Sequence, residues 1–171
     1  MKQLLLALSF CLLAPLAHAW NAAGHRLTAM IAWQQMSPTS REQISAILAH
    51  HPDYARWLEK AKTPDGAAIF CEAATWPDDI RNDPRYQDEM SDSGQRDSSR
   101  HKDWHYVDLA PDGSVSSGQL ERQIELLSRL LRSTANKAQI SYALPWLIHL
   151  VADIHQPLHV GRHGDEGGNR V

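Results

Sequence analysis

Residues 138–160, AQISYALPWLIHLVADIHQPLHV, carry the pattern that decides the fold of this 171-residue chain. The first part of this segment is mostly apolar, which is typical of a helix buried among other helices. Pro145 falls inside the segment, and Gln156-Pro157 ends it because proline removes an amide donor and clashes with the preceding turn. We therefore expect a central helix over residues 138–155.

Two polar residues interrupt the apolar surface of this helix. His149 and Asp153 are four positions apart, so both side chains lie on one face. A buried aspartate is costly unless it is paired or binds a metal. The pair alone is explained more simply by a structural hydrogen bond than by metal binding. His159 follows just past the break and gives a third candidate ligand at the same end of the helix.

A metalloprotease motif is excluded in this segment. His155 and His159 have the spacing of the two histidines on a zinc protease helix, but Gln156 stands where the catalytic glutamate would be. Pro157 also cannot lie inside such a helix.

The rest of the chain predicts an all-α helical bundle with long loops and at most a short β-hairpin. Thr39 and Glu42 have the spacing of a capping box at the start of one helix. The polar region 82–103 is expected to be a surface loop, residues 104–109 a short extended segment, and residues 161–169 a glycine-rich loop. Helices are expected over residues 22–36, 39–50, 54–60, 67–76, 119–132 and 138–155.

The N-terminus has the features of a secretory signal peptide over residues 1–19. Lys2 supplies the positive charge, residues 4–13 form an apolar run, and Ala17-His18-Ala19 fits a cleavage site before Trp20. A membrane anchor is the alternative, but the run is too short to span a bilayer. We expect one mature domain over residues 20–171, secreted or periplasmic, in which Cys71 is the single cysteine.

Composition limits the function classes. The 43% hydrophobic and 22% charged content excludes a disordered or collagen-like chain. The formal net charge of −3 gives no basic field that would attract nucleic acid, so a polyanionic substrate would need local positive charge such as bound metal. Ten histidines and six tryptophans stand out in a chain of this length.

Three further clusters hold candidate functional residues. His105 and Asp108 lie in the segment WHYVD, Asp78 follows TWP with Arg81 three residues later, and His25 lies near a Trp20 amino terminus. Taken singly, the WHYVD segment is explained as a half-buried strand and Asp78 as a helix cap. Arg81 is explained as a surface charge and His25 as a plain helix residue.

Together the clusters resemble the zinc-dependent S1/P1 nuclease family, which prefers single strands and is related to bacterial zinc phospholipase C. The shared pieces occur in the same order along the mature chain and end with Gly167-Gly168-Asn169. The resemblance implies an all-helical fold with three zinc ions in a cleft. It implies these metal ligands: Trp20, His25, Asp78, His105, His149, Asp153 and His159.

The resemblance also distributes the ligands among the three ions. Asp78, His105, His149 and Asp153 resemble the ligands of one ion. Asp153 would bridge to a second ion, held also by His25 and by the amino nitrogen and carbonyl oxygen of Trp20. His159 resembles the first ligand of the third ion, whose other ligands belong to a later His-x3-Asp segment that this sequence does not contain. This difference predicts a chain truncated at its C-terminal end.

The residue types suit the implied chemistry. Imidazole and carboxylate ligands without cysteine favour zinc in an open catalytic site, where paired ions lower the pKa of a shared water. Asp108 resembles the residue that orients the attacking water, and Arg81 resembles the one that pairs with phosphate. His155 is interpreted as a packing or supporting residue.

We therefore expect an exported zinc endonuclease that cleaves single-stranded DNA and RNA to 5′-phosphate products, with 3′-nucleotidase activity as a further expectation. Neither a protein partner nor a membrane span is expected. Two alternatives stay open. One is a zinc phospholipase C, and the other is a metal-binding module without catalysis, should the natural chain end at residue 171.

Overall fold

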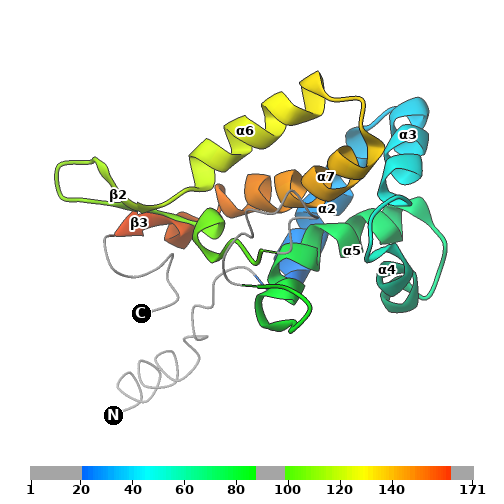
Figure 1. Cartoon of the computed structure of the whole chain (residues 1–171), viewed down its shortest axis with the longest axis horizontal. Helices are drawn as coiled ribbons and strands as arrows, with labels where there is room; N and C mark the ends of the chain where they lie inside the picture. Colours follow the sequence, from blue (N-terminus) through cyan, green and yellow to red (C-terminus); the bar gives the residue numbers. More distant parts are fainter. Residues whose placement is uncertain (1–20, 88–98, 163–171) are drawn as a thin grey trace, which may run out of the picture.

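The computed structural model describes residues 21–87 and 99–162, with one apolar helix at the centre (Figure 1). This helix, α7 (Lys137–Asp153), begins at Asn136, whose side-chain oxygen accepts amide hydrogens of the first turn. It continues through Pro145 and buries most of its second half. Because apolar side chains leave α7 in most directions, other elements must cover it on most sides.

Two helices, α2 (Ala22–Gln35) and α5 (Gly66–Asp79), pack against each other and against α7. The side chain of Asn21 caps α2, and the side chain of Asp65 caps α5 by accepting from the third amide of the helix. Residues 69–77 of α5 are all buried. These three helices form the part of the core that positions the candidate site.

Within the described residues, three more helices pack around this core. The amphipathic helix α6 (Leu120–Ser133) lies along α7, while α3 (Pro38–Leu48) and α4 (Tyr54–Ala61) pack on α5 (Figure 1). The expected capping box at Thr39 and Glu42 is wrong. Ser37 caps α3 instead, because Pro38 occupies the first helical position, where its fixed backbone angle suits a helix start.

A buried carboxylate ties α4 to α5 and to the segment after it. Asp53 is 3% exposed, and its Oδ2 accepts hydrogen bonds from Trp76 Nε1 at 2.9 Å and from the Tyr86 hydroxyl at 3.1 Å. Arg85 donates to both oxygens of Asp53. Trp76 in turn packs edge-on against Trp146 of α7, with ring centroids 5.8 Å apart. This network fixes the C-terminal end of α5.

A small sheet lies at the end of the bundle opposite α3 and α4 (Figure 1). Its strands are β1 (Val107–Leu109), β2 (Val115–Gly118) and β3 (Val160–Arg162), in the order β2-β1-β3. The pair β1–β2 is the expected antiparallel hairpin, and β3 runs parallel to β1. Residues 160–162 thus add a third strand where the sequence predicted the start of a loop.

Short 3-10 helices lead into the sheet and follow α5. They are η1 (Ile80–Asn82), η2 (Lys102–His105) and η3 (Pro157–His159). The prediction of an extended segment from residue 104 is wrong for its first two residues, which belong to η2. The turn starts at His101, which has a positive φ of 45° and whose ring stacks on Trp104 with centroids 3.6 Å apart.

The mostly helical fold class is confirmed. The central helix ends at Asp153, two residues earlier than expected. In the region 82–103, Tyr86, Ser99 and His101 are buried, so the prediction of a surface loop is wrong for these three residues. Residues 1–20, 88–98 and 163–171 lie outside the described residues, and with them the predicted signal peptide, Trp20 and Gly167-Gly168-Asn169. Over residues 21–87 and 99–162, no helix is both long enough and apolar enough to cross a bilayer.

Two glycines of the hairpin give a prediction about folding. Gly113 and Gly118 share a φ of +81°, which costs an L-residue about 1–2 kcal/mol. A Cβ at Gly113 would meet nothing within 4 Å, whereas a Cβ at Gly118 would lie 2.1 Å from the carbonyl oxygen of Tyr106. Gly118→Ala should therefore lower the free energy of unfolding at least about twice as much as Gly113→Ala. Urea unfolding checks this, and equal losses would contradict the close approach of β2 to Tyr106.

Candidate metal centre

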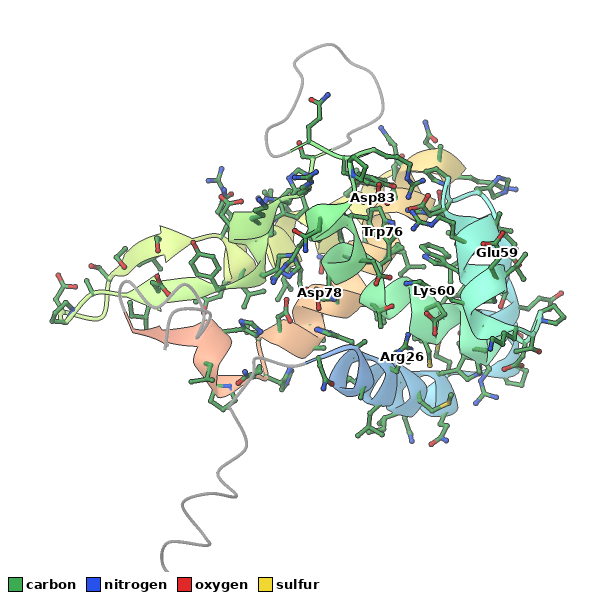
Figure 2. All side chains as sticks on the ribbon, turned by 90° about the horizontal axis from the view of Figure 1, so that it is seen from below. Arg26, Glu59, Lys60, Trp76, Asp78 and Asp83 are labelled. Atoms are coloured by element: carbon green, nitrogen blue, oxygen red, sulfur yellow. The ribbon has the colours of Figure 1, made fainter. Side chains whose placement is uncertain are left out.

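Four side chains from three parts of the chain converge at the C-terminal end of α7. The Nε2 atom of His149 lies 2.9 Å from His105 Nδ1, and each of these nitrogens lies 3.1 Å from Asp153 Oδ2. Asp78 Oδ1 completes the group at 3.8 Å from His149 and 3.9 Å from His105. Figure 2 shows Asp78 at the end of α5, next to the last turn of α7.

His25 lies on the other side of the same two carboxylates. Its Nε2 is 3.4 Å from Asp153 Oδ1 and 3.6 Å from Asp78 Oδ2, and its ring stacks on that of His149 at 3.8 Å. Each aspartate thus turns one oxygen toward His25 and the other toward the pair His105 and His149. His159 Nε2 approaches the same Asp153 Oδ1 at 3.7 Å.

The spacing of the first four ligand atoms fits a single small cation. A tetrahedral zinc ion with ligands at about 2.0–2.1 Å holds those ligands about 3.3 Å from one another. Five separations among these atoms lie between 2.9 and 3.9 Å and bracket that value. The residues present therefore fit the zinc site that the resemblance implies.

One hydrogen bond gives an independent reason for a cation at this place. The main-chain carbonyl oxygen of Ala74 lies 2.8 Å from His149 Nδ1, which donates its hydrogen there. A neutral His149 must then present the lone pair of Nε2 to Asp153 Oδ2, and two facing acceptors repel. A proton or a metal ion between them removes this conflict, and such an outer hydrogen bond is typical of metal-binding histidines.

The ends of the two core helices add to the negative potential. Asp153 is the last residue of α7 and Asp78 the second-to-last residue of α5. The C-terminal end of a helix carries partial negative charge, so both helices favour a cation where their carboxylates meet.

Burial sets the protonation states of the cluster. The side chains of His25, His105, His149 and Asp153 are at most 1% exposed. Burial lowers the pKa of His25 and the pKa of His105 to about 4, so both are neutral and able to bind metal near pH 7. Burial works against the ionised form of Asp153, but the neighbouring His149 and His105 outweigh it and lower the pKa of this carboxyl.

Of the two candidate catalytic residues, Arg81 contacts this cluster, whereas Asp108 follows the ligand His105 by three positions in the chain. Arg81, in η1, has its Nε 3.3 Å from Asp78 Oδ1, so a guanidinium borders the ligand group. Asp108, in β1, is 1% exposed and accepts a hydrogen bond from the Ser117 hydroxyl. His155, by contrast, is exposed, and its Nδ1 lies 2.7 Å from the main-chain carbonyl oxygen of Val151 one turn earlier, which does not support a packing role.

Comparison with known proteins now identifies the family. The family model of the S1/P1 nucleases matches residues 20–171. The chain belongs to the S1/P1 nuclease family. Endonuclease 1 of Arabidopsis thaliana is 27% identical over 183 residues, which cover 99% of this chain and 53% of the relative. Endonuclease 4 of the same plant is 28% identical, over 91% of this chain and 50% of the relative.

Nuclease S1 of Aspergillus oryzae is 24% identical over 170 residues, which cover 93% of this chain and 50% of the relative. The chain thus spans about half the length of the curated relatives it matches. The resemblance seen in the sequence motifs is confirmed at the level of the family.

Two interactions that hold ligand residues of this candidate metal centre in place were not predicted from the sequence. The Ala74 carbonyl that orients His149 is a main-chain atom, so the residue type at this position gives no signal. Arg26 forms a bidentate ion pair with Glu72 and joins α2 to α5 next to His25. Its Nε donates to Oε1 at 2.9 Å and its Nη2 donates to Oε2 at 3.0 Å. Glu72 is 7% exposed, and only its place in a largely apolar helix pattern could have marked it as paired.

The lowered histidine pKa values predict acid sensitivity of the metal-free chain. His25 and His105 bind protons more readily in the unfolded chain, where their pKa is about 6.5, than in the folded chain, where it is about 4. Their contribution to stability is complete above pH 6.5 and is lost as the pH falls toward 4. The raised pKa of His149 opposes this loss only in part.

We expect the melting temperature in chelator to fall by roughly 5 °C or more between pH 7 and pH 5. His25→Gln should make this dependence shallower, because it removes one of the two groups. A melting temperature that stays constant over this range would contradict the neutral buried histidines.

Proposed function

We propose that this chain is an exported, zinc-dependent endonuclease that hydrolyses phosphodiester bonds of single-stranded DNA and RNA to 5′-phosphate products. The observation that carries the proposal is the ligand group around Asp153. Two aspartates each turn one oxygen toward His25 and the other toward the pair His105 and His149. Carboxylates shared in this way suit two neighbouring ions.

The residues that would hold zinc follow from these contacts. One site consists of Asp78, His105, His149 and Asp153. A second consists of Asp153, His25 and the amino nitrogen and carbonyl oxygen of Trp20, which lies outside the described residues. His159 would be the first ligand of a third site. Bound zinc would lower the pKa of a water molecule and offset the charge of the phosphodiester.

The chain's own groups would supply the remaining steps. The Arg81 guanidinium borders the ligand group, where it can donate to a phosphate oxygen as negative charge develops. The Asp108 carboxylate would accept a hydrogen bond from the attacking water and orient it. As the water oxygen bonds to phosphorus, the bond between phosphorus and the 3′ oxygen would break and the water would lose one proton to the solvent. The leaving 3′ oxygen would take up a proton from the solvent, and the phosphate would stay on the 5′ end of the product.

Charge explains why such a chain would need metal for this substrate. The formal net charge of −3 repels a polyanion, and the buried aspartates add to the repulsion at the site. Two or three divalent ions would reverse the sign of the local potential. The signal peptide proposed for residues 1–19 would carry the chain out of the cytoplasm and free the Trp20 amine.

Zinc binding gives the first test of this proposal. Zinc at about a hundred times its dissociation constant should stabilise the folded chain by about 3 kcal/mol. Asp153→Asn should bind less zinc than any other single-ligand variant, because Asp153 is the more buried of the two aspartates that face both His25 and the pair His105 and His149. The matched control is His155→Ala, which removes an exposed histidine of the same motif. Elemental analysis and thermal unfolding give the result, and a melting temperature unmoved by zinc and by chelator would contradict the metal sites.

Hydrolysis gives the second test. The zinc-loaded protein should cleave single-stranded DNA and RNA to 5′-phosphate ends and should lose this activity in chelator. Asp108→Asn should lower kcat by about a hundredfold, because it removes the acceptor that orients the water. Two results would overturn the proposal. Hydrolysis of phosphatidylcholine alone would indicate a phospholipase C, and zinc binding without any hydrolysis would indicate a metal-binding module.

A further inference from the structure

The hairpin next to the ligand group contains a bulge at the residue proposed to orient water. Asp108 pairs with Ser117 across β1 and β2, while the next pair is Leu109 with Val115. Ser116 is therefore the extra residue on β2. A bulge of this kind bends the strand and changes the direction of side chains, and such bulges are common near active sites.

The bulge allows two neighbouring serines to contact the same aspartate. The Ser117 hydroxyl donates to Asp108 Oδ2 at 2.9 Å, and the Ser116 hydroxyl donates to the main-chain carbonyl oxygen of Asp108 at 3.0 Å. In a regular strand these two serines would point to opposite faces. Both the side chain and the main chain of Asp108 are thus held from β2.

This arrangement matters because Asp108 is 1% exposed. A buried carboxylate needs hydrogen-bond donors, and each donor also fixes the rotation of the carboxylate plane. On its other side β1 pairs with β3, where Asp108 lies opposite Gly161, two residues beyond His159. The Ser117 contact therefore fixes the carboxylate relative to β1, which begins two residues after His105, and to β3, which begins directly after His159.

We propose that Ser117 is a positioning residue that holds the Asp108 carboxylate in the direction required to orient the attacking water. The role of Asp108 itself rests on the proposed function. Ser117 touches neither the substrate nor a metal ligand in this account. It acts through Asp108, and the bulge at Ser116 brings its hydroxyl to Oδ2.

Three variants test the proposal. Ser117→Ala removes the donor, Ser117→Thr keeps a hydroxyl, and Ser114→Ala is the matched control. Ser114 donates to the carboxylate of Asp112 at 2.6 Å, so the control removes the same kind of contact from the exposed turn of the same hairpin.

The first readout does not depend on activity. The side-chain carboxyl carbon resonance of Asp108, observed by NMR, should shift in Ser117→Ala and return toward its original position in Ser117→Thr. It should not move in Ser114→Ala. A resonance that is unchanged in Ser117→Ala would overturn the proposal.

Kinetics give the second readout. Ser117→Ala should lower kcat on single-stranded DNA by about tenfold with KM unchanged, and Ser117→Thr should restore it. In an Asp108→Ala background, Ser117→Ala should have no further effect, because the serine acts only through the carboxylate. A further loss of kcat in that background would assign Ser117 a merely structural role and overturn the proposal.

The two proposals fail in different ways. If Asp108→Ala is inactive and Ser117→Ala keeps its full kcat, the positioning role is wrong and the proposed function stands. If Asp108→Ala keeps full activity, the proposed role of Asp108 is wrong.

Discussion

The structure depends on keeping the Asp153 carboxylate charged in a place that is only 1% exposed to water. An isolated charge in such a place would cost several kcal/mol of stability. The chain meets this requirement by bringing imidazoles from α2, η2 and α7 to within 3.4 Å of the two oxygens. The packing of α2, α5 and α7 is therefore tied to the chemistry of the site, and the site cannot be altered without affecting the core.

The same constraint explains where the ligands lie along the chain. The two aspartates occupy the ends of α5 and α7, and His105 and His159 end η2 and η3. Residues at helix ends are fixed by the helix behind them, yet the backbone beyond them is free to turn. Trp76 and Arg85 donate hydrogen bonds to Asp53, and these bonds hold the end of α5. At η3, the side-chain oxygen of Gln156 accepts a hydrogen bond from the amide of Leu158 and fixes the start of that short helix. A site built on helix ends is rigid without requiring long loops.

The sequence predicted the central helix and the shared face of His149 and Asp153, because both follow from helical spacing. It did not by itself bring His25, Asp78 and His105 to that face, since no local rule relates residues this far apart in the chain. Their association came from the resemblance to the nuclease family, and the structure brings these three side chains together with Asp153. The 3-10 turn at His105 depends on the stacking of His101 on Trp104, and the start of α3 depends on Pro38. In each case the local sequence is compatible with two similar structures. Long-range packing selects one of them at His105, and a single residue selects one at the start of α3.

The hydrogen bond between His149 and Ala74 has a consequence for how the family can vary. The acceptor is a peptide carbonyl, which every amino acid possesses, so no substitution at position 74 removes it. The size of the side chain at position 74 is restricted instead, because Ala74 is 1% exposed in the packed core. Natural variants should therefore tolerate glycine or serine there, and the orientation of the histidine should be lost only when a larger side chain forces the helices apart.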